Sequence, residues 1–173
     1  WPMMTLILKN ELGYSASQVA GIMMILGFVQ LPCTLIGGKL ADRFSKRNII
    51  IVCDLVTVVS YFICGFLPID RKMIPLLAIA ALFAQMEWPS YDALVADLSS
   101  VNDRERAYSL NYLGLNLGLV LAPILGGFLF AEHLNLAFLI SSIATFSSTI
   151  LIVFFIKDIT PVQEESVSSQ YEQ

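Results

Sequence analysis

Five long apolar stretches, separated by short polar or charged segments, constrain the fold of this chain more than any other feature. A helix needs about 20 mostly apolar residues to cross the hydrocarbon core of a bilayer. Stretches of about this length run over residues 19–40, 49–68, 74–94, 108–130 and 134–156. They are continuous and lack the alternation of a barrel strand. The sequence therefore predicts an all-α, polytopic bundle of transmembrane helices.

The composition agrees with a membrane protein and excludes most soluble classes. Hydrophobic residues make up 57% and charged residues 14% of the 173 residues, whereas about 25% charged residues is typical of soluble domains. Four of the 14 acidic residues follow Lys157. The formal charge of −4 therefore reflects the end of the chain. It indicates no acidic or basic partner, and we expect no nucleic-acid partner.

The two ends of the chain differ from the five stretches. Residues 1–8 are apolar but too few to cross a bilayer, and we interpret them as the last turns of a preceding helix. Residues 158–173 are rich in Ser, Gln and Glu. They are expected to form a polar cytoplasmic tail or linker after a transmembrane bundle over residues 1–157.

The basic residues predict the orientation of the bundle. If the loop from Lys39 to Arg47 is cytoplasmic, seven Lys and Arg residues lie on that side and three on the other. Cytoplasmic loops carry an excess of Lys and Arg. The first full span is therefore expected to run from outside to inside, and the last to end in the cytoplasm.

The loop after the first full span carries a recognisable motif. Its pattern resembles the loop motif of the major facilitator superfamily, G-x-x-x-D-R/K-x-G-R/K-R/K, with Ser45 in place of the second glycine. The matching residues are Gly38, Asp42, Arg43, Lys46 and Arg47. Gly38 is expected to permit close approach between helices, and the cationic residues are expected to anchor at the inner headgroups.

The fourth span carries a second motif, which is similar to the antiporter motif of helix five in this family. The matching positions are Gly118, Pro123, Gly126 and Gly127, while Ala122 and Ser109 stand where the family has glycine. Proline removes a backbone hydrogen bond and bends a helix. Small residues beside it let a neighbouring helix pack closely. The alternative is a small-residue helix contact that does not set the direction of transport.

The resemblance implies a particular place for these spans in a larger fold. Trp88-Pro89, Asp97 and Arg104-Glu105-Arg106 resemble the end of helix four and the loop that follows it. The five spans then resemble helices two to six of a twelve-helix transporter in a plasma membrane. The carboxy-terminal bundle is the missing partner in this interpretation. Transport would proceed by alternating access around a site near the midplane.

Three carboxylates within the spans are candidates for proton coupling. Glu87 lies roughly 20 Å from the outer end of its helix, and its span contains no Lys or Arg, so we expect it to load and release the coupled proton. Asp92 lies roughly 140° around the helix from Glu87, so the two are not expected to face the same cavity. Asp54 lies only about 8 Å inside Ile49, where it is expected to reach the inner headgroups or the arginine cluster.

Charged residues at the cytoplasmic helix ends are candidates for a conformational latch. Asp97 lies at the C-terminal end of its helix, where the helix dipole disfavours an unpaired anion, so a cationic partner is expected. By resemblance to family members, the latch comprises Gly38, Asp42, Arg43, Lys46, Arg47, Asp97 and Arg106. The alternative is a set of solvated surface pairs worth under about 1 kcal/mol each.

Polar and aromatic residues of the spans outline a candidate wall for a substrate cavity. These residues are Gln30, Gln85, Asn111, Asn116, Trp88 and Tyr91. The two asparagines are five residues apart, so only one is expected to face any single cavity. For the aromatic residues Trp88 and Tyr91, the alternative is a plain lipid or helix contact.

The chemistry of the chain favours transport over catalysis. The sequence contains no nucleophile triad, metal-ligand spacing, phosphate loop or nucleotide motif, so we expect no enzyme activity, cofactor or metal. The partial antiporter motif favours proton-coupled efflux of drugs or other amphipathic compounds. The arginine often found in helix four of family antiporters is absent here. A proton-coupled nutrient symporter and a non-transporting membrane partner therefore stay open as alternatives.

Overall fold

The structure is a computed structural model that describes residues 2–100 and 102–156, with backbone alone for residues 2, 3 and 130–132. The predicted tail over residues 158–173 and the basic residue Lys157 lie outside the described residues. The described helices are α1 (Pro2–Leu6), the wider π-helical turn η1 (Ile7–Glu11), α2 (Ala16–Arg43), α3 (Lys46–Phe66), α4 (Met73–Leu98), α5 (Arg104–Glu132) and α6 (Leu134–Phe155).

Five of these helices, α2 to α6, are long and apolar enough to cross a membrane. The predicted all-α bundle with five spanning helices is therefore confirmed. α2 and α3 begin at residues 16 and 46 rather than 19 and 49 because serine caps set their first turns. The Ser15 hydroxyl accepts from Gln18 N and the Ser45 hydroxyl accepts from Asn48 N, each at 3.3 Å.

Helical structure at the start of the chain extends to Glu11, beyond the predicted residues 1–8. Ile7 and Leu8 are almost fully buried and belong to the apolar core at one end of the bundle, where residues of α2, α3, α4 and α6 meet. The Arg71 guanidinium lies 5.6 Å from the centre of the Tyr14 ring at the same end. These contacts tie the short segment to the spanning helices.

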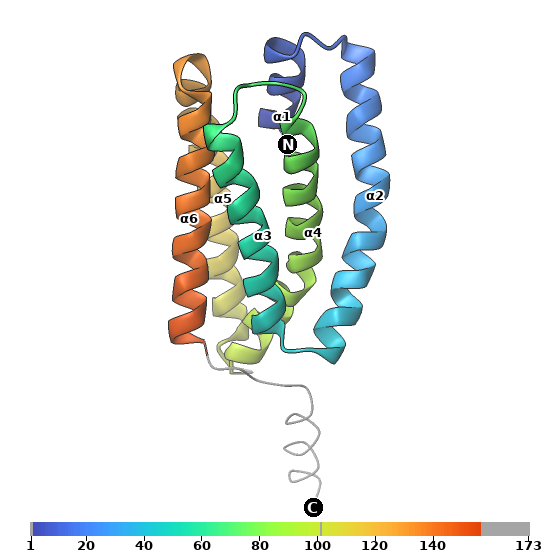
Figure 1. Ribbon diagram of the computed structural model, residues 1–173. Helices are drawn as coiled ribbons and strands as arrows, with labels where there is room; N and C mark the ends of the chain where they lie inside the picture. The colour runs from blue at the N-terminus through green and yellow to red at the C-terminus, as the bar shows by residue number, and fades with distance from the viewer. Residues whose placement is uncertain (1, 101, 157–173) are drawn as a thin grey trace, which may run out of the picture.

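Helices α3 and α4 form the centre of the bundle (Figure 1). α3 packs against α4 on one side and α6 on the other, and α2 packs against α4. α5 packs more loosely, against α6 and α4, and most of its side chains are exposed. The α2–α3 and α4–α5 connections lie at the same end, which the basic residues predict to be cytoplasmic.

Polar side chains of α6 join it to α3 along the whole interface. Asn135 Nδ2 donates to the Leu67 carbonyl at 2.9 Å, Ser142 Oγ donates to the Val58 carbonyl at 3.1 Å, and Thr149 Oγ1 donates to the Asp54 carboxylate at 2.7 Å. Residues seven apart lie on one face of a helix. Hydrogen bonds of this kind hold transmembrane helices together where burial from water cannot.

The closest approach between α2 and α4 occurs at Gly37. A Cβ atom built on Gly37 would overlap the backbone of Met86 and lie 2.9 Å from its carbonyl carbon, whereas a Cβ on Gly38 would meet nothing within 4 Å. The expectation that Gly38 permits the close approach is therefore wrong. Neighbouring helix residues point about 100° apart, and the rotation of α2 turns Gly37 towards α4.

Candidate functional site

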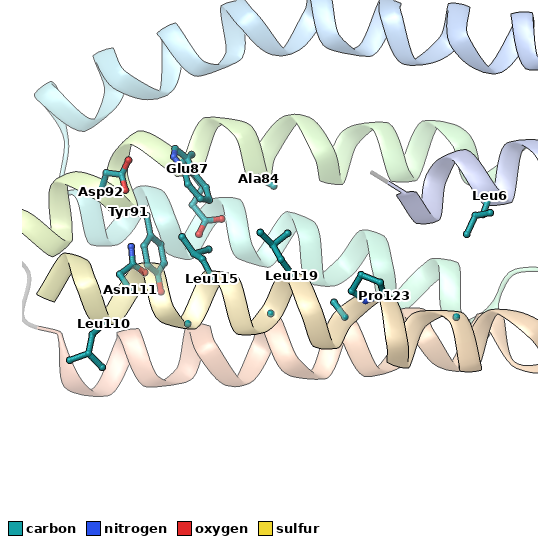
Figure 2. Close-up of a pocket in the computed structure, with 15 residues that line it drawn as sticks. Leu6, Ala84, Glu87, Tyr91, Asp92, Leu110, Asn111, Leu115, Leu119 and Pro123 are labelled. Atoms are coloured by element: carbon teal, nitrogen blue, oxygen red, sulfur yellow. The ribbon is translucent and has the colours of Figure 1, made fainter. Parts of the chain in front are cut away.

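A cavity of about 960 Å³ lies between α4 and α5 and is the candidate functional site. Helix α4 contributes Ala84, Glu87, Trp88, Tyr91 and Asp92 to its wall. Figure 2 shows Glu87 and Tyr91 projecting from α4 towards α5, and Leu115 and Leu119 projecting from α5 towards α4. Most of the wall is apolar. The cavity therefore suits a compound with a large apolar surface and few polar groups.

Glu87 and Asp92 both line this cavity, so the expectation that they face different cavities is wrong. The α4 residues of the wall are spaced at i, i+3, i+4, i+7 and i+8, with Glu87 and Asp92 at the two edges of this face. The separation of about 140° between Glu87 and Asp92 around α4 excludes a shared cavity only if that cavity is narrow. Because α5 packs loosely against α4, the cavity is wide enough to include both residues. Asp92 also lines a smaller neighbouring pocket with Glu105 and Tyr112.

Asp54 lies inside the bundle and hydrogen-bonds to Thr149. Its exposed fraction is 6%, and its carboxylate accepts a hydrogen bond from Thr149 Oγ1 at 2.7 Å. The structure therefore contradicts the expectation that Asp54 reaches the headgroups or the arginine cluster. The reason is the rotation of α3, which directs Asp54 towards Thr149 on α6.

The aromatic and amide candidates divide between the cavity and the α2–α4 contact. Trp88, Tyr91 and Asn111 line the cavity. Asn116 does not, and its Nδ2 donates to the Tyr112 carbonyl at 2.7 Å. Only one of the two asparagines thus faces the cavity, as predicted from their spacing.

Gln30 and Gln85 lie away from the cavity, between α2 and α4. Gln85 Nε2 donates to Thr34 Oγ1 at 3.1 Å, and Gln30 Nε2 is buried with no partner among the described residues. These two amides therefore contribute to helix packing in this conformation.

The small residues of α5 make room for the cavity rather than for a neighbouring helix. Gly118, Ala122, Pro123 and Gly127 line it, whereas Gly126 is not among the wall residues. A Cβ on Gly118 or Gly127 would meet nothing within 4 Å. The expected close packing of a neighbour against this helix is therefore not present among the described residues.

Charged side chains at the cytoplasmic end form a contact between α3 and α4. Lys46 Nζ lies 2.6 Å from Asp97 Oδ2, which gives Asp97 the cationic partner expected from the helix dipole. Arg47 donates to the Val153 carbonyl of α6 at 2.8 Å. In the part of the chain that the structure describes, neither Arg43 nor Arg106 forms an ion pair with Asp97, and Asp42 takes part in no ion pair. Of the predicted latch residues, the structure thus joins Lys46 to Asp97.

Lys46 and Asp97 are expected to be energetically coupled, because their charged groups lie 2.6 Å apart at the surface of the bundle. A double-mutant cycle of Lys46→Ala and Asp97→Ala is predicted to give a coupling energy of about 1 kcal/mol in the unfolding of purified protein. The control cycle pairs Arg43→Ala with Asp97→Ala and should be additive. Equal coupling in both cycles contradicts a specific Lys46–Asp97 contact.

The sequence argument missed Thr149, whose hydroxyl donates to the Asp54 carboxylate. Thr149 lies 95 residues after Asp54, so no local pattern connects the two. A signal was nevertheless present, because Asn135, Ser142 and Thr149 recur every seven residues on a helix that contains no charged residue. Such a polar line predicts a face buried against another helix.

The sequence matches the family model of the Major Facilitator Superfamily over residues 1–171. Multidrug resistance protein 1 of Bacillus subtilis (strain 168) is 24% identical over 87% of this chain and 39% of that protein. The class C tetracycline resistance protein of Escherichia coli is 24% identical over 83% of this chain and 36% of that protein. The crystal structure of peptide transporter POT in complex with sulfate gives a TM-score of 0.77 at 21% identity, over 96% of this chain and 38% of that chain. This chain therefore spans roughly two-fifths of the length of these relatives.

Proposed function

This chain belongs to the Major Facilitator Superfamily, and we propose that it serves secondary active transport by alternating access, as proton-coupled efflux of amphipathic compounds. It works as a multi-pass protein of the plasma membrane, together with a second helix bundle that completes the transport path. The relatives named for multidrug and tetracycline resistance support efflux. The likeness to a peptide transporter concerns the fold alone.

One observation carries this proposal: an acid stands in the wall of a large apolar cavity within the membrane. Glu87 is half-buried, and neither α4 nor α6 contains a Lys or Arg that could neutralise it. An acid at membrane depth is costly unless it is protonated, paired or in contact with water, so it marks an ion or proton path. Glu87 is therefore the coupling residue of the proposal.

The chemistry of the wall favours a substrate that is both apolar and positively charged. Trp88 and Tyr91 flank Glu87 on α4 and offer aromatic faces to a cation. The Glu87 carboxylate attracts such a cation, and the protonated carboxyl does not. Proton and cation then compete for one group. Binding of the proton from outside releases the substrate, and binding of the substrate inside releases the proton.

The Lys46–Asp97 pair has a role in alternating access under this proposal. It joins the start of α3 to the end of α4 at the predicted cytoplasmic face. The Arg104 side chain extends this contact by donating to the Ala96 carbonyl at 3.2 Å, which ties the start of α5 to the end of α4. These contacts would have to break or rearrange when the helices separate at this face.

The proposal is tested by efflux of ethidium from cells that express the complete reading frame containing this chain. The expected result is efflux above the vector control that a protonophore abolishes, because the proton gradient supplies the energy under this proposal. Efflux that persists with the protonophore contradicts proton coupling. Uptake of a dipeptide driven by an inward proton gradient, without ethidium efflux, would replace the proposal with symport. If neither ethidium efflux nor dipeptide uptake is detected, the result favours the non-transporting alternative.

Filling the cavity at Gly118 is expected to impair transport without unfolding the protein. A Leu side chain at this position enters the cavity, and a Cβ on Gly118 meets no atom within 4 Å. Gly118→Leu is therefore predicted to raise the half-maximal concentration for ethidium efflux at least about tenfold, equivalent to 1.4 kcal/mol of lost binding. Gly21→Leu on α2 is the control, since Gly21 is equally open and lies outside the cavity. Equal effects of the two changes would contradict the placement of the substrate in this cavity.

A further inference from the structure

The wall of the cavity between α4 and α5 changes in chemistry along its length. Figure 2 shows Asp92 and Asn111 near one end, Pro123 and Leu6 towards the other, and Glu87 between them. From Glu87 to the predicted cytoplasmic end, the wall carries carboxylate, amide, phenol and indole groups. On the outer side of Glu87, the described wall residues carry none of these groups. The cavity is thus polar in its inner half and apolar in its outer half.

The apolar half runs along α5, which contributes small residues to its wall. Gly118, Ala122 and Gly127 line it together with Pro123. A Cβ atom on Gly118 or Gly127 would meet no atom within 4 Å, so the space beside both glycines is open. Leu6 of α1 belongs to the wall at the far end of this half. An occupant of the apolar half therefore contacts hydrocarbon groups and is offered no hydrogen-bonding side chain by the described wall.

The length of the apolar half follows from the geometry of α5. Leu115 lies at nearly the same level along the bundle as Glu87 (Figure 2), and Gly127 follows Leu115 by twelve residues. At about 1.5 Å per residue, the distance between them along the helix axis is roughly 18 Å. An extended tetradecyl chain has about this length, whereas a hexyl chain covers less than half of it.

The charged groups of the wall favour one direction for an elongated cation. Glu87 is the acid nearest the apolar half, and Trp88 and Tyr91 on the same helix offer aromatic faces to a cation. Further acids, Asp92 and Glu105 of the neighbouring pocket, lie only towards the inner end. A cationic group at the outer end would lose all of these contacts. The cation is therefore expected at Glu87, and the apolar part of the molecule in the outer half.

We infer that the cavity favours cations that carry one long unbranched alkyl chain, with the cationic head at Glu87 and the chain extended along α5 to Gly127. Gly127 then determines specificity, because its lack of a side chain sets the longest chain that fits. Each buried methylene group is expected to raise affinity about fourfold, equal to 0.8 kcal/mol. The inference names the substrate class of this cavity, and it rests on the proposed function for the transport of that substrate.

Displacement of radiolabelled tetraphenylphosphonium from the purified complete protein tests the inference, with hexyltrimethylammonium and tetradecyltrimethylammonium as the competing compounds. Gly127→Leu is expected to weaken the tetradecyl compound at least about tenfold, because at least two methylene groups no longer fit. The hexyl compound ends before Gly127, so its affinity should stay within about twofold of the wild-type value. Comparing variant and wild-type protein at the same chain length cancels the partition of the compounds into detergent.

Two control variants show whether the effect depends on position along the cavity. Gly118→Leu places a side chain close to Glu87 and should weaken both compounds, whereas Gly21→Leu lies outside the cavity and should weaken neither. Each variant is first checked for a single monodisperse peak in size-exclusion chromatography. A monodisperse Gly127→Leu protein that weakens both compounds equally, or neither of them, overturns the inference.

Photolabelling tests the orientation of the chain in the wild-type protein, where folding of a variant is not in question. The probe is tetradecyltrimethylammonium with a diazirine at the end of its alkyl chain. It is expected to label α5 between Leu119 and Leu129, and an excess of tetraphenylphosphonium should prevent this labelling. Labelling of residues 104–114 instead, or the absence of competed labelling on α5, overturns the inference.

The inference and the proposed function can fail separately. If the tetradecyl compound binds in this orientation but ethidium efflux persists with a protonophore, the substrate class stands and proton coupling is overturned. If ethidium efflux requires the proton gradient but the tetradecyl compound does not bind, the proposed function stands and the inference is overturned. If tetraphenylphosphonium itself does not bind, radiolabelled tetradecyltrimethylammonium replaces it, and the same order of affinities among the variants is expected.

Discussion

Replacing Glu87 by Gln is expected to lower protonophore-sensitive ethidium efflux at least about tenfold, a change equivalent to 1.4 kcal/mol. Glutamine has nearly the same shape as a protonated glutamic acid but cannot release a proton or carry a negative charge. The variant therefore resembles the state that has bound its proton and cannot exchange it for a cationic substrate. Efflux rates from cells producing equal amounts of each protein measure the effect.

Asp92→Asn provides the matched control for this prediction. Asp92 lines the same cavity but is exposed, and it also borders the smaller pocket beside Glu105. Water can therefore stabilise its charge, and its replacement is expected to leave efflux within about threefold of the wild-type rate, or less than 1 kcal/mol. If Glu87→Gln supports efflux equal to that of the wild-type protein, the proposal of efflux stands but Glu87 is excluded as the coupling residue. A larger loss in Asp92→Asn would assign coupling to Asp92.

Replacing Gly37 by Val is expected to separate α2 from α4 and destabilise the protein by about 3 kcal/mol, at the upper end of typical overpacking costs. The atoms that a Cβ would meet belong to the Met86 backbone, which cannot rotate away as a flexible side chain does. The neighbouring Ala41 and Met86 also belong to the packed contact between these helices and α3. The whole contact must therefore shift to accommodate the substitution.

Gly38→Val is the control, because it places the same side chain one residue further along the same helix. The intrinsic helix propensity of Val affects both variants equally, and a Cβ on Gly38 meets no atom within 4 Å. Thermal unfolding in detergent compares the two variants. A lower midpoint for Gly37→Val than for Gly38→Val is predicted, and the reverse order would contradict the observed rotation of α2.

Much of the fold follows from the sequence because the bilayer imposes a minimum length on each apolar stretch. The five spanning helices were predicted in order, and their starts differ where caps such as Ser15 and Ser45 extend them. Rotation of each helix about its axis was harder to predict. The loop motif draws attention to Gly38, but only the packed structure shows that Gly37 faces α4.

The candidate site was predictable where a single helix carries the signal. Glu87 is recognisable as an acid within an apolar span that lacks a cation, and its position on the cavity wall agrees with that interpretation. The environment of Asp54 was not predictable, since its hydrogen-bond partner Thr149 lies on α6, 95 residues further along the chain. The shared cavity of Glu87 and Asp92 depends on how far α5 stands from α4. Periodicity within α4 contains no information about that distance.

The most direct test of proton-coupled efflux is the proton movement that a substrate gradient causes in vesicles reconstituted with the complete protein. An inward gradient of tetraphenylphosphonium is imposed without a pH gradient, with valinomycin and potassium holding the membrane potential at zero, and a trapped dye reports the internal pH. Antiport predicts that the lumen becomes more alkaline as protons leave in exchange for the entering cation, and that Glu87→Gln abolishes this change. Acidification of the lumen would show that proton and cation move together, and an unchanged pH during cation entry would show uncoupled transport. Either result would contradict the proposed function.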